Sequence, residues 1–120
     1  MIDAKFKFER LDVWKEAMDL GEVLHLTTLS FPELEIYNLG SQLRRASDSV
    51  ALNISEGSIG QTNPEQKRFI GYSIRSLAEV VTCLHKAKRR EHVTETEFEE
   101  LYERSYKLMN QLLAFRRAIR

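Results

Sequence analysis

The hydrophobic positions of the chain repeat at helical spacing in four long stretches. Between residues 38 and 57 the apolar side chains recur at steps of three or four, at Leu39, Leu43, Ala46, Val50 and Ile54. This spacing places them on one face of an α-helix. Gly57 follows as a stop signal, because glycine adopts the positive φ found just past many helix ends. The pattern predicts a helix over about 39–56.

Three further stretches show the same periodicity. Helices are predicted over about 11–28, 64–90 and 94–118. The second of these has Pro64 in its first position, where the missing N–H costs nothing. The third begins with Thr94-Glu95-Thr96-Glu97, which matches a capping box. The first is expected to present one face made of Leu11, Trp14, Met18, Gly21, His25 and Thr28, with Ala17 and Leu24 beside it.

Four such helices with short connections favour an all-α, antiparallel up-down-up-down four-helix bundle, forming a single domain over residues 1–120. The chain has only two prolines and five glycines, which agrees with long helices. Pro32 breaks the pattern after the first helix and can begin a single helical turn. Surplus apolar side chains outside the main stripes suggest self-association. They are Leu20, Leu52, Ile74 and Leu113.

The two halves of the chain carry opposite charge, although the whole chain is neutral. Residues 1–60 hold six Lys or Arg against ten Asp or Glu, and residues 61–120 hold twelve against eight. A local basic face can bind a polyanion even in a neutral protein. The candidate nucleic-acid contacts all fall on the third helix, at Lys67, Arg68, Lys86, Lys88, Arg89 and Arg90. The last four also suit a solvated helix C-terminus, so both interpretations stay open.

A second set of polar residues interleaves with the core positions of the 39–56 helix. If the second and third helices run antiparallel about a loop near residue 60, Arg44 and Arg45 lie near the level of Glu79. One of the two arginines is predicted to pair with Glu79, and the sequence does not say which. Asn53 and Glu56 are predicted to hold groups near the 57–63 loop. The five residues form a predicted structural network.

The search for reactive groups yields no catalytic site. Cys83 is the sole cysteine, which excludes an internal disulfide, and it does not share a helix face with His85. Di-iron bundles use two Glu-x-x-His motifs, and the chain does not have both, so neither a metal nor another cofactor is predicted. No segment approaches the ~18–20 consecutive apolar residues that span a bilayer. A non-enzymatic cytoplasmic protein without membrane contact is expected.

Five motifs occur in order along the chain. They are Phe8-x-x-Leu11-x-Val13-Trp14-x-x-Ala17, Phe31-Pro32-x-x-Glu35-x-Tyr37-x-Leu39, Gln42-Leu43-Arg44-Arg45-Ala46, Ser49-Val50-x-x-Asn53-Ile54-x-Glu56-Gly57 and Ser76-Leu77-x-Glu79. Together they resemble the 23S rRNA-intervening-sequence protein family, also labelled S23, and the resemblance covers about residues 8–84.

The resemblance implies a four-helix bundle that assembles as a homo-oligomer, in several members a ring of five. Some members are encoded within insertions in bacterial 23S rRNA genes. A related branch is the accessory protein of diversity-generating retroelements, which binds nucleic acid. Two classes of function therefore remain for this chain. One is an oligomeric module that contacts RNA or another nucleic acid through a basic rim, and the other is a scaffold for a protein partner without nucleic acid.

Overall fold

The structure is a computed structural model that describes residues 2–60 and 62–120. The main elements are the helices α1 (Asp12–Thr28), α3 (Leu39–Gly57), α4 (Asn63–Arg89) and α5 (Glu95–Ala118). Each of the four predicted helices lies within one residue of these bounds at either end. Two short elements join them, the 3-10 helix η1 (Lys7–Arg10) and the helical turn α2 (Glu33–Ile36). Gln61, in the predicted loop, lies outside the described residues.

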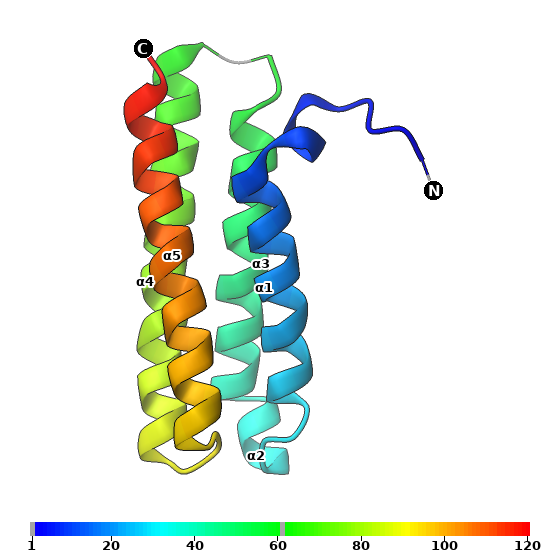
Figure 1. Cartoon of the computed structure of the whole chain (residues 1–120). Helices are drawn as coiled ribbons and strands as arrows, with labels where there is room; N and C mark the ends of the chain where they lie inside the picture. Colours follow the sequence, from blue (N-terminus) through cyan, green and yellow to red (C-terminus); the bar gives the residue numbers. More distant parts are fainter. Residues whose placement is uncertain (1, 61) are drawn as a thin grey trace.

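The four long helices form one antiparallel bundle. In Figure 1, α1 and α4 run down the bundle while α3 and α5 run up it, and α1 packs beside α3, α3 beside α4 and α4 beside α5. Helices α1 and α5 close the bundle on the remaining side. No strand occurs in residues 2–60 or 62–120. The predicted all-α four-helix bundle is confirmed.

The core agrees with the predicted stripe of α3, whose five residues are all buried, but not with that of α1. The buried side of α1 consists of Val13, Ala17, Leu20, Leu24 and Thr28. The predicted α1 face was therefore rotated by about one residue from the buried one, although its Thr28 and the flanking Ala17 and Leu24 are buried. Met18 and His25, which were assigned to that face, are exposed. The reason is that α1 has apolar side chains on two faces, and periodicity alone does not say which one meets the bundle.

The same rotation changes the predicted surplus apolar surface. Leu20 is only 4% exposed and belongs to the core, so its assignment to the surplus surface was wrong. Ile74 packs against the core, and Leu113 is half-buried. Leu52, at 58% exposed, remains on the surface.

Small residues and polar pairs join α3 to α4. The buried Ser73 donates its hydroxyl proton to the carbonyl oxygen of Val50 at 2.8 Å. Ser76 Oγ lies 2.9 Å from Ser49 Oγ, and Asn53 donates to the carbonyl and hydroxyl oxygens of Ser49. Asn53 therefore forms its hydrogen bonds in the middle of the α3–α4 interface, and its predicted role at the 57–63 loop was wrong. Glu56 is exposed and forms no hydrogen bond or ion pair within the described part of the chain.

Gly57 marks the closest approach of α3 to α4. A Cβ atom at Gly57 would lie 2.7 Å from Cβ of Phe69, too close for any side chain. Gly57→Ala is expected to destabilise the protein by about 1–3 kcal/mol, because the two helices must move apart. Gly71→Ala is the matched control, since a Cβ there would meet only Nη1 of Arg116 at 3.7 Å.

For Gly71→Ala, the higher helix propensity of alanine is expected to raise stability by about 0.5–1 kcal/mol. Urea unfolding of both variants at neutral pH provides the measurement. Equal changes in stability, of the same sign in both variants, would show that the close α3–α4 contact at Gly57 does not cause the destabilisation.

Candidate functional site

Arg44 holds the connection between α1 and α3. Its guanidinium donates to Thr28 Oγ1 and to the carbonyl oxygen of Ile36, each at 2.9 Å. Thr28 is fully buried, and its hydroxyl donates a hydrogen bond to the carbonyl oxygen of His25 at 2.8 Å. The arginine thereby joins the end of α1 to α2, and α2 to the start of α3.

The predicted pairing of Arg44 or Arg45 with Glu79 was wrong. Glu79 and Arg45 are exposed, and the ion pairs formed among the described residues include neither of them. The observed seam, with Ser76 opposite Ser49, is shifted by about one helical turn from the assumed register. Arg44 is also rotated toward the α1–α3 connection, away from α4.

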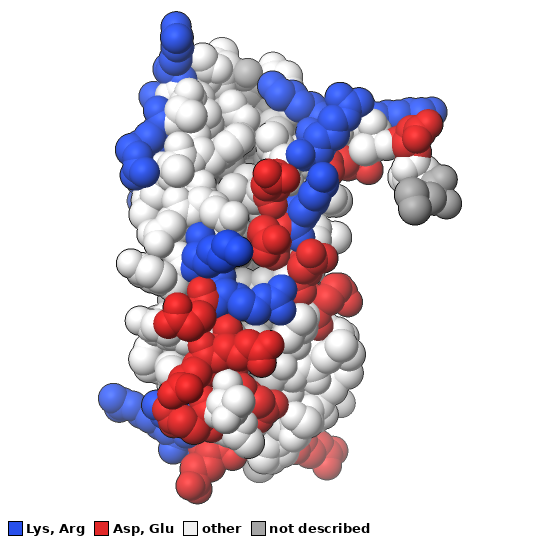
Figure 2. Space-filling model, viewed as in Figure 1, with Lys and Arg blue, Asp and Glu red and all other residues white. Residues whose placement is uncertain are grey.

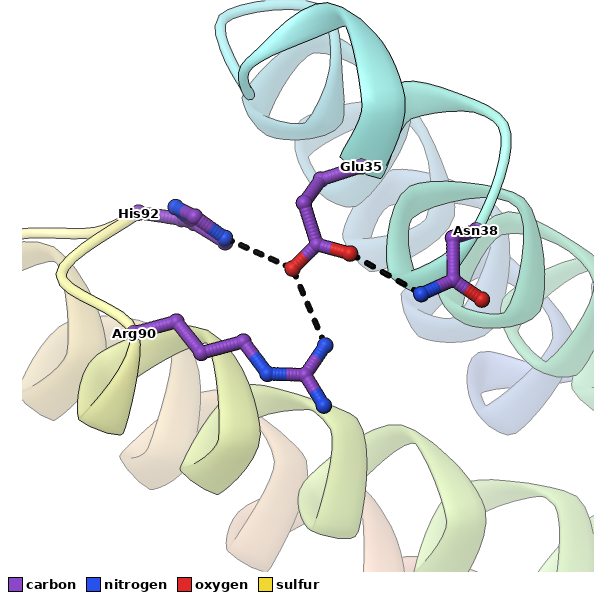
Figure 3. Close-up of polar contacts among 4 residues, drawn as sticks. All are labelled: Glu35, Asn38, Arg90 and His92. Atoms are coloured by element: carbon purple, nitrogen blue, oxygen red, sulfur yellow. Dashed lines mark hydrogen bonds and ion pairs between the residues drawn. The ribbon is translucent and has the colours of Figure 1, made fainter.

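A carboxylate on α2 fastens the other side of the same connection. Figure 3 shows Glu35 directed at the turn after α4, where its Oε2 lies 2.7 Å from His92 Nε2 and 2.9 Å from Arg90 Nη1. Its Oε1 accepts a hydrogen bond from Asn38 at 3.0 Å. The hydrogen bonds from His92, Asn38 and Arg90, in that order, lower the pKa of Glu35 from its usual 4.5 to about 2. Glu35 thus clamps α2 to a segment more than fifty residues away in the chain.

The lowered pKa of Glu35 gives a pH-dependent contribution to stability. The folded state favours the charged form of Glu35, so the stabilisation is complete above about pH 4.5, the usual pKa. It is lost as the pH falls through the folded-state pKa of about 2. Glu35→Gln is expected to lower the unfolding midpoint at pH 7, and its difference from wild type is expected to close between these two pH values.

The exposed Glu33, on the same helical turn, provides the matched control. Glu33→Gln is expected to leave the midpoint unchanged at every pH. Thermal unfolding followed by circular dichroism between pH 7 and pH 2 checks both variants. A difference between wild type and Glu35→Gln that persists unchanged at the lowest pH would contradict the clamp.

The predicted basic rim at the end of α4 is of mixed charge. Lys88 pairs with Glu95 at 3.2 Å, and Arg90 pairs with Glu35 at 2.9 Å. Lys86 and Arg89 are exposed at the same end, beside the acidic first turn of α5. At the opposite end of α4, Arg68 pairs with Glu65, and Lys67 forms no ion pair with a described residue. Of the six predicted contacts, three are therefore engaged with carboxylates of the chain itself.

A more strongly basic surface lies at the opposite end of the α4–α5 pair. The close approach of Gly71 to Arg116 sets residues 62–78 of α4 and its cap beside residues 109–120. These two segments hold six cationic side chains against one carboxylate, that of Glu65. We call this set the basic end; it consists of Lys67, Arg68, Arg75, Arg116, Arg117 and Arg120. Figure 2 shows Lys and Arg at the upper left, over the end of α5, with no Asp or Glu beside them in this view.

The basic end continues toward the N-terminal segment. A shallow hollow is bordered by Lys7, Arg120 and the polar side chains of Asn63 and Gln66. The first turn of α4 faces the same end, where the positive end of the helix dipole favours anions. Tyr72 is 38% exposed and lies between Arg68 and Arg75 at helical spacing on α4. The end therefore combines cationic side chains, the positive end of a helix dipole and an accessible aromatic ring.

Sequence reasoning identified two of these residues, Lys67 and Arg68, and missed the others. The three arginines near the end of α5 have the composition of an ordinary helix C-terminus, as Lys86 to Arg90 have. The missing signal was the local balance of charge. Acidic residues flank Lys86 to Arg90 along the chain, whereas none occurs between residues 104 and 120.

The described residues provide no other chemistry at either end. Cys83 is buried, and desolvation raises the pKa of its thiol, which keeps it protonated. No group of three His, Cys, Asp or Glu side chains in the described ranges is arranged to hold a metal ion. No helix among those described is both long and apolar enough to traverse a bilayer.

The comparisons with known proteins agree on one family. A search of curated proteins found no match. A crystal structure from Bacteroides thetaiotaomicron, described as a protein with unknown function from the S23 ribosomal protein family, superposes with a TM-score of 0.81 over 88% of this chain and 96% of that one. At 17% identity this likeness shows the fold. The family model for the 23S rRNA-intervening sequence protein matches residues 9–114, and the chain therefore belongs to that family.

Proposed function

We propose that this bundle is a nucleic-acid-associated protein that contacts RNA phosphates through the basic end. The observation that supports the proposal best is the local charge balance, six cations against one carboxylate over two adjacent helix ends. A phosphate backbone is the polyanion that such a surface fits, since each contact releases condensed counterions. The net neutrality of the chain does not oppose this, because the acidic residues gather elsewhere.

The contacts are expected to position the protein on RNA without reading its sequence. Arginine and lysine side chains reach phosphate oxygens, which are the same in every sequence. Tyr72 offers one ring on which an unpaired base can stack, flanked by Arg68 and Arg75. A single ring is too little for base-specific recognition. Structured RNA with exposed loops is therefore the proposed ligand class, bound with poor sequence discrimination.

A homo-oligomer, in the ring of five that the family resemblance implies, would repeat the basic end around one assembly. Several weak contacts presented together raise the overall affinity by effective concentration. The exposed Leu52 supports self-association, because a monomer has no partner for it. The proposed ligand would then bind across neighbouring subunits.

RNA binding is tested by fluorescence anisotropy with a labelled stem-loop at low and near-physiological salt. Phosphate contacts from the five cations other than Arg68, which pairs with Glu65, would give a slope of log K against log salt of roughly −4.5, by the relation of about −0.9 per contact. A random-sequence stem-loop of equal length is the control and is expected to bind similarly. Absence of binding at low salt, or a slope near zero, would contradict the proposal.

The second candidate is a protein-partner scaffold, and one observation favours it. Leu34 and Tyr37 on the clamped α2 connection are 86% and 79% exposed, while Glu35 and Ile36 between them are fastened inward. Leu26 and Leu29 at the end of α1 are exposed as well. Apolar side chains held on a rigid connection suit a protein contact better than a polyanion. Failure of the RNA titration would favour this candidate.

A further inference from the structure

The N-terminal arm, residues 2–6, leaves the bundle with apolar side chains uncovered. Figure 1 shows it extending away from the helices beyond η1. Ile2 is 82% exposed and Phe6 is 62% exposed. Apolar residues occupy alternate positions at Ile2, Ala4 and Phe6, with Lys5 and Lys7 among the polar ones. An extended segment with this alternation has one apolar edge and one polar edge, which carries Asp3 and Lys5.

Hydrogen bonds fix the direction of the arm. Glu9 Oε1 accepts from the backbone N–H of Phe6 at 2.9 Å, and the N–H of Glu9 donates to the carbonyl of Phe6 at 3.1 Å. Arg10 Nη2 donates to the carbonyl of Ala4 at 2.9 Å. These contacts hold the arm on a course away from its own bundle. Folding it back along α1 would require breaking them.

A groove of matching character lies along the outer side of α1 and α3. Its volume is about 470 Å³. Small residues make its floor, because Gly21 lets the helices approach until a Cβ there would lie 3.2 Å from Ser47 Oγ. Met18 and Leu52, 42% and 58% exposed, form apolar walls. The carboxylates of Glu22 and Asp48 stand at its border.

We infer that the arm of one copy docks in the α1–α3 groove of a second copy. The apolar edge of the arm fits the walls made by Met18 and Leu52. On the polar edge Lys5, with Lys7 next to the arm on η1, outnumbers Asp3, and the two lysines complement the carboxylates of Glu22 and Asp48. The lengths agree, since five extended residues span about 16 Å. The groove from Trp14 to Glu22 measures roughly 12 Å along α1. This inference does not depend on RNA binding.

The groove of the same molecule is the less suitable receptor. The ring of Phe8 contacts that of Trp14, with centroids 5.4 Å apart, so the arm begins at one end of its own groove. From that point the hydrogen bonds of Glu9 and Arg10 lead it outward. A second copy accepts the arm without losing these bonds. Successive copies joined by arm and groove form a head-to-tail chain that can close into a ring, whereas two copies that exchange arms form a two-fold dimer.

Two single variants test the docking in the full-length chain. Phe6→Asp places a charge on the apolar edge of the arm and leaves the groove intact, while Leu52→Asp does the reverse. Each alone is expected to shift the self-association measured by light scattering toward the 14 kDa monomer. Leu34→Asp is the matched control, since it places the same charge on an exposed leucine away from both surfaces. Circular dichroism confirms that each variant is folded.

Mixing the two variants makes the test decisive. Leu52→Asp retains an intact arm and Phe6→Asp retains an intact groove, so the mixture is expected to associate where neither variant does alone. Trp14 lines the groove and is the sole tryptophan, so its emission is expected to shift on mixing. A monomeric wild type at micromolar concentration, unchanged association in either variant, or no association of the mixture would overturn the inference. A Trp14 shift independent of protein concentration would place the arm in its own groove and overturn it as well.

Discussion

Replacing Arg116, Arg117 and Arg120 together by alanine is expected to weaken RNA binding by on the order of 10²-fold at ~0.1 M salt. The three side chains lie beside the first turns of α4 and carry half of the cations of the basic end. Each lost phosphate contact removes one released counterion, so the slope of log K against log salt is expected to become shallower by about 0.9 per contact. Anisotropy titrations at several salt concentrations measure both quantities.

The matched control removes the same number of charges from the other end of α4. Lys86, Lys88 and Arg89 stand beside carboxylates, and Lys88 already pairs with Glu95. Their joint replacement by alanine is expected to change the affinity only a few-fold, through the general change in net charge. A larger loss of RNA affinity in this control than in the α5 variant would show that RNA binds at the rim predicted from the sequence, at the C-terminal end of α4.

Arg44→Ala is expected to lower the free energy of unfolding by on the order of 2–3 kcal/mol. The change removes two hydrogen bonds from a charged donor and leaves the carbonyl of Ile36 and the buried hydroxyl of Thr28 short of a partner. Because α2 loses one of its two fastenings, the clamp through Glu35 is expected to weaken with it. Denaturant unfolding at neutral pH gives the difference from wild type.

Two controls separate this effect from a general loss of charge. Arg45→Ala removes the same side chain from the next position, where it is exposed, and is expected to cost less than ~0.5 kcal/mol. Glu79→Ala is expected to be equally mild, because Glu79 is exposed and forms no ion pair with a described residue. Comparable losses in Arg44→Ala and Arg45→Ala would contradict the role given to Arg44.

The helices were predictable because their signals are local. The capping box at Thr94, Pro64 at the start of α4 and the three-four spacing of α3 act within a few residues of one another. The buried face of α1 was not predictable, because Trp14 and Met18 fit the helical spacing as well as Val13 and Ala17 do. What selects the buried face is the partner surface on α3. That surface is not encoded in the α1 segment.

The polar sites depend on contacts between distant segments and were predicted poorly. Glu35 meets Arg90 and His92 only because the bundle brings α2 to the turn after α4. The sequence did not decide between Arg44 and Arg45 as the structural residue, because the partners of Arg44 lie on the α1–α3 connection and its guanidinium binds a backbone carbonyl. Backbone carbonyls occur at every residue, so no sequence pattern marks the one that is used.

The measurement that tests the central claim most directly is ultraviolet crosslinking of the wild-type protein to RNA, with the crosslinked peptides identified by mass spectrometry. Binding through the basic end predicts crosslinks within residues 66–75, which include the exposed Tyr72, and within residues 112–120. Crosslinks confined to residues 86–97 would place the RNA on the mixed-charge end and contradict the account.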